Sequence, residues 1–457
     1  MLMSRRTVWV AALCALAALI VWPWFIERRM TLEAQAALPT PAPVIADYAS
    51  REQVVSFYER DARRHPDDQI IARLLATQYL QRFRERNDVG DLLRAQAQAQ
   101  HSLALQPRNN IGADMTMTSA LLSLHQFRSA LRYVHEAEQI EPWNPAPTAQ
   151  EISLQTELGR YDVADKLLRH PPPGMRRNDV WDGAQARYDE ITGGLAHARR
   201  LIDRAMADAD AVMDNPAETR AWYHMRSGEL AFSAGDYLTA EQRFNEALAI
   251  FPSDAKALSG LARLAWANRR WPEALRFAAR AAELLPTPET LGYEADAQRA
   301  LGDPGAAAQT EDLIGAVERV GNARGINDRA LAVYYAEHRE HLADALRIAR
   351  RDLAARDDIY AEDTLAWVLG ANGRWAEARK YAREATRFDT EDARLQFHAG
   401  IIALRNDDVE EGRRRLGFAL RLSPHFHPDY ADQAKRALAE LAGADGSKTA
   451  LSGDKWH

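Results

Sequence analysis

Apolar residues recur every three or four positions through most of the chain, and charged residues fill the positions between them. This spacing places the apolar side chains on one face of each helix and predicts a succession of short amphipathic α-helices. The clearest example is residues 221–254, where two such helices are joined by Gly235-Asp236 and ended by Pro252. Small residues fall where the two helices must approach closely, at Gly228, Ala240 and Ala247. Phe232, Tyr237 and Phe244 are large enough to fill the space between them.

The pattern returns 34 residues later. Counted from Ala255, the positions 17, 20, 24, 27 and 32 hold Trp271, Ala274, Ala278, Ala281 and Pro286. This spacing resembles the tetratricopeptide repeat, a helix–turn–helix unit of 34 residues. The resemblance covers about residues 47–441. It implies an all-α fold in which roughly ten helix pairs stack as a right-handed superhelical solenoid around one continuous core.

The arrangement of these segments predicts six parts. They are a basic flank (1–6), a transmembrane signal anchor (7–26), a Pro/Ala-rich linker (27–46), a first repeat sub-array (47–174), a second sub-array with a capping helix (179–442) and a disordered polar tail (443–457). The boundary between the sub-arrays is placed at the helix-breaking run Pro171-Pro172-Pro173-Gly174.

The anchor is predicted because residues 7–26 carry no charge and would span ~30 Å as a helix, the thickness of a bilayer core. Arg5 and Arg6 precede this segment, whereas Glu27 partly offsets Arg28 and Arg29 after it. The positive-inside rule then favours export of the repeats. A stretch at 357–404 and the motif LSPHFHP at 422–428 also resemble a bacterial group of membrane-anchored or exported tetratricopeptide proteins. We therefore expect a single-pass inner-membrane protein with a periplasmic repeat domain.

Two alternatives to this topology remain open at the sequence level. Ala34-Gln35-Ala36 matches a signal-peptidase pattern, so the segment could be cleaved. The repeats could also face the cytoplasm as an anchored adaptor.

Composition excludes several functional classes. The net charge of −7 is spread along the chain and argues against nucleic-acid binding, which normally needs a basic patch. Cys14 is the single cysteine, so the repeats have no disulfide, thiolate metal site or cysteine nucleophile. No nucleophile elbow or glycine-rich dinucleotide motif is present, and we expect neither catalysis nor a cofactor.

What remains is a binding surface. In the family that the chain resembles, positions 2, 5, 9, 12 and 13 of each first helix line a concave groove that binds a protein or peptide partner. Carried onto this sequence, they are Trp222, Met225, Glu229, Phe232, Lys256, Arg263, Trp266, Tyr334, Glu337, Tyr360, Trp367, Arg394 and Phe397. Trp, Tyr and Arg commonly anchor protein interfaces. The alternative is that several of the aromatic residues belong to the core.

Histidine pairs provide a rival hypothesis. His338 and His341 are three residues apart, and His425 and His427 flank Phe426. Either pair could contribute to a metal site in an envelope carrier or sensor, but zinc sites normally need three or four ligands. The simpler interpretation is that these side chains cap helices and turns. The sequence therefore favours a membrane-tethered, non-catalytic scaffold for a partner protein, with the metal carrier as the alternative.

Overall fold

A computed structural model describes residues 50–444 except 174, 176 and 324–328. The predicted anchor, the linker and most of the polar tail lie outside the described residues. Within the described part the chain forms twenty-two α-helices and no β-strand. The helices are α2 (Arg51–Arg64), α3 (Gln69–Arg86), α4 (Val89–Leu105), α5 (Ile111–Ser123), α6 (Phe127–Ile140), α7 (Pro145–Glu157), α8 (Tyr161–Arg169), α9 (Asp179–Ile191), α10 (Leu195–Ala211), α11 (Ala217–Ser233), α12 (Tyr237–Ile250), α13 (Ala255–Ala267), α14 (Trp271–Leu284), α15 (Pro288–Ala300), α16 (Pro304–Ala323), α17 (Arg329–His338), α18 (Leu342–Ala355), α19 (Ile359–Ala371), α20 (Trp375–Ala385), α21 (Ala393–Leu404), α22 (Val409–Leu422) and α23 (Tyr430–Ala444). Among these described helices, none is long and apolar enough to cross a membrane.

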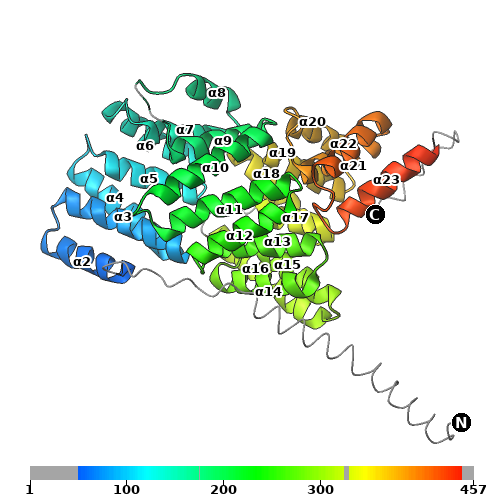
Figure 1. Cartoon of the computed structure of the whole chain (residues 1–457), viewed down its shortest axis with the longest axis horizontal. Coiled ribbons are helices and arrows are strands. Elements are labelled where there is room, and N and C mark those ends of the chain that lie inside the picture. Colours follow the sequence, from blue (N-terminus) through cyan, green and yellow to red (C-terminus); the bar gives the residue numbers. More distant parts are fainter. Residues whose placement is uncertain (1–49, 174, 176, 324–328, 445–457) are drawn as a thin grey trace, which may run out of the picture. The chain divides into compact units, whose positions relative to one another are not determined.

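The helices from α3 to α22 form ten successive pairs, with α2 before the first and α23 after the last (Figure 1). The predicted all-α repeat fold of roughly ten pairs is therefore confirmed for the described residues. At the proline-rich stretch α8 ends at Arg169 and α9 begins at Asp179. Helix α9 nevertheless packs directly on α7, so the stacking of first helices continues past the prolines.

The turn of each pair has a residue in the left-handed backbone region: Asn87, His125, Gly159, Gly193, Gly235, Arg269, Gly302, Arg339, Gly373 or Asp407. The α17/α18 turn has a second such residue, His341. At the predicted Gly235-Asp236 turn, the Asp236 amide donates to the Ala231 carbonyl at 2.9 Å, which satisfies the end of α11. Glycine adopts this conformation without steric cost, which explains why half of the ten turns use it.

The core between pairs follows the predicted alternation of small and large residues. Phe244 is 2% exposed and lies against two glycines, one on its own pair and one on the next. A Cβ atom added to Gly228 or Gly260 would lie 2.7 or 2.5 Å from the Phe244 ring. Only residues without a side chain fit at these two positions, so Phe244 joins α11 and α13 in one core.

Hairpin turns of earlier pairs also contact the turns between pairs that come much later in the chain. Five hydrogen bonds join described residues 159–199 positions apart: Ile359 N to Tyr161 Oη at 3.1 Å, Thr390 Oγ1 to the Ile191 carbonyl, Tyr237 Oη with Ser423 Oγ at 2.8 Å, His425 N to Tyr237 Oη at 2.8 Å, and Arg269 Nη2 to the Pro428 carbonyl at 2.6 Å. These contacts, which we call the turn-to-turn contacts, bring the first helices of early pairs against those of late pairs. The repeat pattern alone did not predict them.

Candidate partner-binding groove

Two adjoining cavities lie along the first helices of consecutive pairs. The Lys256 cavity, about 270 Å³, is lined by residues of α11, α13 and α15 together with Phe244 of α12, and the Trp266 cavity, about 250 Å³, by residues of α13, α15, α17 and α21. Glu289 lines both cavities. Eight of the predicted groove residues line one or the other: Glu229, Phe232, Lys256, Arg263, Trp266, Tyr334, Glu337 and Arg394. The family register therefore brings these eight together.

The Trp266 cavity has aromatic walls. Trp266 is 5% exposed, and its Nε1 donates to Asp296 Oδ2 at 2.9 Å. Its ring centroid lies 4.9 Å from that of Tyr293 and 4.5 Å from that of His427. Trp266 is thus a buried core residue that also forms part of a cavity wall, which combines the two interpretations open at the sequence level.

Charged groups face one another across this cavity. Glu337 Oε1 lies 3.5 Å from Arg394 Nη1, and among the described residues no group donates a hydrogen bond to this oxygen. Burial raises the pKa of Glu337, and the positive charge of Arg394 only partly opposes this shift. His338 bonds to Asp296 Oδ1 at 2.9 Å. Burial alone would lower the pKa of His338, but that bond and the Asp296 charge raise it to about 9, so the imidazole is a cation at neutral pH.

The other five predicted groove residues line neither cavity. Met225 is 2% exposed and Phe397 is fully buried, so the prediction that they line an open groove is wrong. Both occupy position 5 of a first helix, and both side chains belong to hydrophobic core clusters. Trp367 is half-buried and stacks on His398 with ring centroids 4.2 Å apart. Trp222 is half-buried beside Tyr223.

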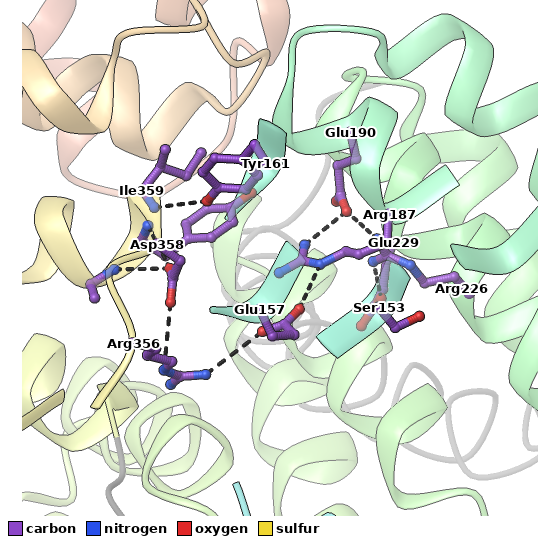
Figure 2. Close-up of polar contacts among 12 residues, drawn as sticks. Ser153, Glu157, Tyr161, Arg187, Glu190, Arg226, Glu229, Arg356, Asp358 and Ile359 are labelled. Carbon is purple, nitrogen blue, oxygen red and sulfur yellow. Dashed lines mark hydrogen bonds and ion pairs between the residues drawn. The ribbon is translucent and has the colours of Figure 1, made fainter. Parts of the chain in front are cut away.

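Tyr360, the fifth, lies beside Arg187, whose guanidinium carbon is 5.3 Å from the centre of the Tyr360 ring. Arg187 belongs to a chain of ion pairs that crosses three first helices (Figure 2). Arg187 contacts Glu157 at 3.0 Å and Glu190 at 2.8 Å, and Arg226 contacts Glu190 and, at 2.6 Å, Glu229. Burial would raise the pKa of Glu190, but the charges of Arg226 and Arg187 lower it overall. Of these charged residues, only Glu229 also lines one of the two cavities.

The ion pairs continue into the second half of the chain. Arg356 Nη1 lies 3.7 Å from Glu157 Oε2, and its Nε lies 3.5 Å from Asp358 Oδ2 (Figure 2). Arg329 pairs with the same Asp358 at 2.6 Å. The turn-to-turn contact near Tyr161 therefore combines a hydrogen bond with a buried network of charges.

Comparison with known proteins agrees with this architecture. A family model described as tetratricopeptide repeat matches residues 231–301, which include α12, α13, α14 and α15. Over these residues the chain matches the tetratricopeptide repeat that the 34-residue spacing predicted. A comparison with curated proteins gave no match.

Several solved structures are similar to the chain at low identity. Yeast Tom70 is 14% identical, with 86% of this chain and 93% of that chain covered and a TM-score of 0.32. PilW, described as a type IV pilus biogenesis factor, is 18% identical, with 54% and 92% covered and a TM-score of 0.31. Human IFIT1, solved as a dimer with m7Gppp-AAAA, is 13% identical, with 73% and 76% covered and a TM-score of 0.47.

Sequence reasoning missed Arg329, Ala330 and Val333 of α17, which line the Trp266 cavity. It also missed all four lining residues of α15: Glu289, Gly292, Tyr293 and Asp296. These four lie in the pair α15/α16, whose repeat signature is weak. Continuing the 34-residue count from Ala255 makes Glu289 position 1 and Tyr293 position 5 of this tetratricopeptide unit. The register would therefore have identified Tyr293, whereas nothing in the pattern distinguishes Asp296.

The four candidate metal-binding histidines have other contacts. Both ring nitrogens of His338 are engaged, by Asp296 and by the Tyr334 carbonyl at 2.9 Å. His427 is buried, and its Nδ1 accepts from the amides of Asp429 and Tyr430 at 3.1 and 3.3 Å. His341 and His425 are exposed and lie beside tyrosine rings. Within the described part of the chain, none of the four belongs to a group of three potential ligands close enough to share an ion.

Proposed function

We propose that this protein is a membrane-tethered, non-catalytic scaffold that binds an extended segment of a partner protein across the Lys256 and Trp266 cavities. The observation that supports the proposal is the pair of adjoining cavities with Glu289 in common. Each cavity combines apolar walls with charged side chains, a combination typical of interface hot spots. The cavity walls belong to packed helices, so a ligand would not have to order them on binding.

The lining residues suggest what each cavity accepts. In the Trp266 cavity, the rings of Trp266, Tyr293 and Tyr334 suit an aliphatic or aromatic stem, and Glu337 Oε1 is available to accept a hydrogen bond. In the Lys256 cavity, the exposed Lys256 and half-buried Arg263 can donate to carboxylate or carbonyl oxygens. The proposed segment therefore carries a hydrogen-bond donor for one cavity and an acceptor for the other.

Tethering and export are part of the proposal and rest on the uncharged run at 7–26 and its flanking arginines. Reporter fusions after Ala46 test the topology. Activity of a phosphatase that folds only outside the cytoplasm is the expected result. Fluorescence of a reporter that matures only in the cytoplasm would favour the anchored-adaptor alternative.

The binding proposal is tested by filling one cavity. A photo-reactive amino acid at the exposed position 256 should cross-link the partner in membranes, and mass spectrometry then identifies the cross-linked segment. Val333→Trp should fill the Trp266 cavity and weaken binding of the identified segment at least tenfold, because the half-buried Val333 lines that cavity. Leu238→Trp is the matched control, because Leu238 is 81% exposed and lines neither cavity. Equal affinity of the two variants, with equal thermal midpoints, would refute this site.

A further inference from the structure

A second group of polar residues lies outside the groove, on α6 and α7. His135 and Glu138 are three residues apart on α6 and so share one face of that helix, and Glu151 faces them from α7. One ligand atom from each of the three lies within 4.8 Å of the other two. His135 Nε2 and Glu151 Oε1 are already 3.0 Å apart. Of the described residues, these three form the one group with the composition and spacing to hold a metal ion.

The two carboxylates of this group have no arginine or lysine partner among the described residues. In the described part of the chain, no Arg or Lys forms an ion pair with Glu138 or Glu151, although Glu151 is only 7% exposed. By contrast the buried Asp91, 2% exposed, contacts both Arg82 and Arg94 at 2.6 Å. Two neighbouring carboxylates that are not neutralised by an arginine or lysine are suited to a bound cation.

Gln155 gives an independent indication of a ligand. It is 4% exposed, and its Nε2 donates to Glu151 Oε1 at 2.9 Å. Its own Oε1 is buried without a hydrogen-bond partner in the described part of the structure. The oxygen and nitrogen of a glutamine amide are assigned from their hydrogen bonds, and the reversed amide would present Oε1 to an ion at Glu151.

We propose that His135, Glu138 and Glu151 bind one divalent transition-metal ion, with Zn²⁺ as the representative. Imidazole and carboxylate are both common zinc ligands, with bonds of roughly 2.0–2.2 Å. Tetrahedral ligands at that radius lie about 3.3–3.5 Å apart, so small side-chain rotations would close the present separations. Imidazole among the ligands argues against Mg²⁺ and Ca²⁺, which prefer oxygen. The ion would join α6 to α7, and a fourth position is open to Gln155 or water.

The test uses the full chain, stripped with a chelator and titrated calorimetrically with ZnCl₂. We expect one equivalent to bind saturably, and we expect His135→Ala and Glu138→Gln each to weaken binding at least tenfold. Both variants should fold, because His135 is half-exposed and Gln keeps the shape of Glu138. His65→Ala is the control: His65 is exposed and lies 3.9 Å from Asp61, but it belongs to no three-ligand group among the described residues.

Three results would overturn the proposal. They are the absence of saturable zinc binding, wild-type affinity in both site variants, and loss of binding in His338→Ala/His341→Ala rather than in the site variants. Because this site does not involve the Lys256 or Trp266 cavity, its failure would leave the scaffold proposal untouched.

Discussion

The turn-to-turn contact at Gly159 can be perturbed by a single methyl group. Gly159 and Gly373 occupy equivalent hairpin turns, and each has φ of 74°. A Cβ atom on Gly373 would meet nothing within 4 Å, whereas one on Gly159 would lie 1.9 Å from the Asp357 carbonyl oxygen. Gly159→Ala and Gly373→Ala therefore share the same backbone strain and differ in the contact with the later turn.

The structure gives the size of the expected difference. Left-handed alanine costs roughly 1–2 kcal/mol at either position. In Gly159→Ala the two turns must also separate by about 1 Å, since real Cβ contacts essentially never fall below 3.0 Å. That movement disturbs the Ile359–Tyr161 hydrogen bond and the Arg356–Glu157 ion pair. One hydrogen bond is worth about 1 kcal/mol and a disturbed buried ion pair more, so we expect an additional loss of about 2–4 kcal/mol.

Amide hydrogen exchange measures this loss locally, which matters because a repeat array need not unfold in one step. The Ile359 amide, which donates to Tyr161 Oη, should exchange at least roughly 30-fold faster in Gly159→Ala than in Gly373→Ala, as an opening free energy about 2 kcal/mol lower requires. Urea midpoints should shift in the same order. Equal exchange of Ile359 in the two variants would refute the packing of these turns.

The remaining predictions concern the Trp266 cavity. Trp266→Ala should lower the free energy of unfolding by about 3–5 kcal/mol, because Trp266 is buried in the core. Trp222→Ala should lower it by less, because Trp222 is half-buried. Equal losses of stability in urea denaturation would contradict this ranking. His338→Gln should destabilise the protein in a pH-dependent way. The pKa of His338 is raised to about 9 in the folded protein, against roughly 6.5 in the unfolded chain. The protonated side chain, which faces Asp296 and Glu337, therefore contributes its full stabilisation below about pH 6.5 and loses it as the pH rises through 9. The difference in thermal midpoint between wild type and His338→Gln should therefore shrink across that range, and a constant difference would show that the Asp296–His338 ion pair is not its source.

The sequence predicted the features that neighbouring pairs determine. Gly228, Ala240 and Phe244 specify the contact inside one pair, and Gly235 specifies its turn, so their 34-residue spacing was enough to predict the stacked pairs. The same local logic located eight of the residues that line the two cavities. It was wrong for Met225 and Phe397, because these two side chains are buried in core clusters, whereas Tyr293 at the same repeat position 5 lines a cavity.

Contacts between distant pairs could not be predicted in this way. Trp266 packs against His427, and Tyr161 accepts from the Ile359 amide 198 residues away. Which pairs meet depends on the small rotation from each pair to the next, accumulated over several repeats. No single repeat encodes that accumulated rotation. The sequence therefore could not distinguish a cavity-lining residue that is buried by a distant pair from one that is exposed.

The same contacts limit what the proposed groove can hold. They bury Trp266 and bring Arg394 of a late pair into a cavity formed mainly by earlier ones. The two spaces that remain, about 250 and 270 Å³, are smaller than the roughly 300–1,000 Å³ typical of ligand pockets. An α-helix with its side chains is about 10–12 Å across and would not fit in either space. An extended strand can place one side chain in each cavity while its backbone passes Glu289, so the binding proposal requires an extended partner segment rather than a helical one.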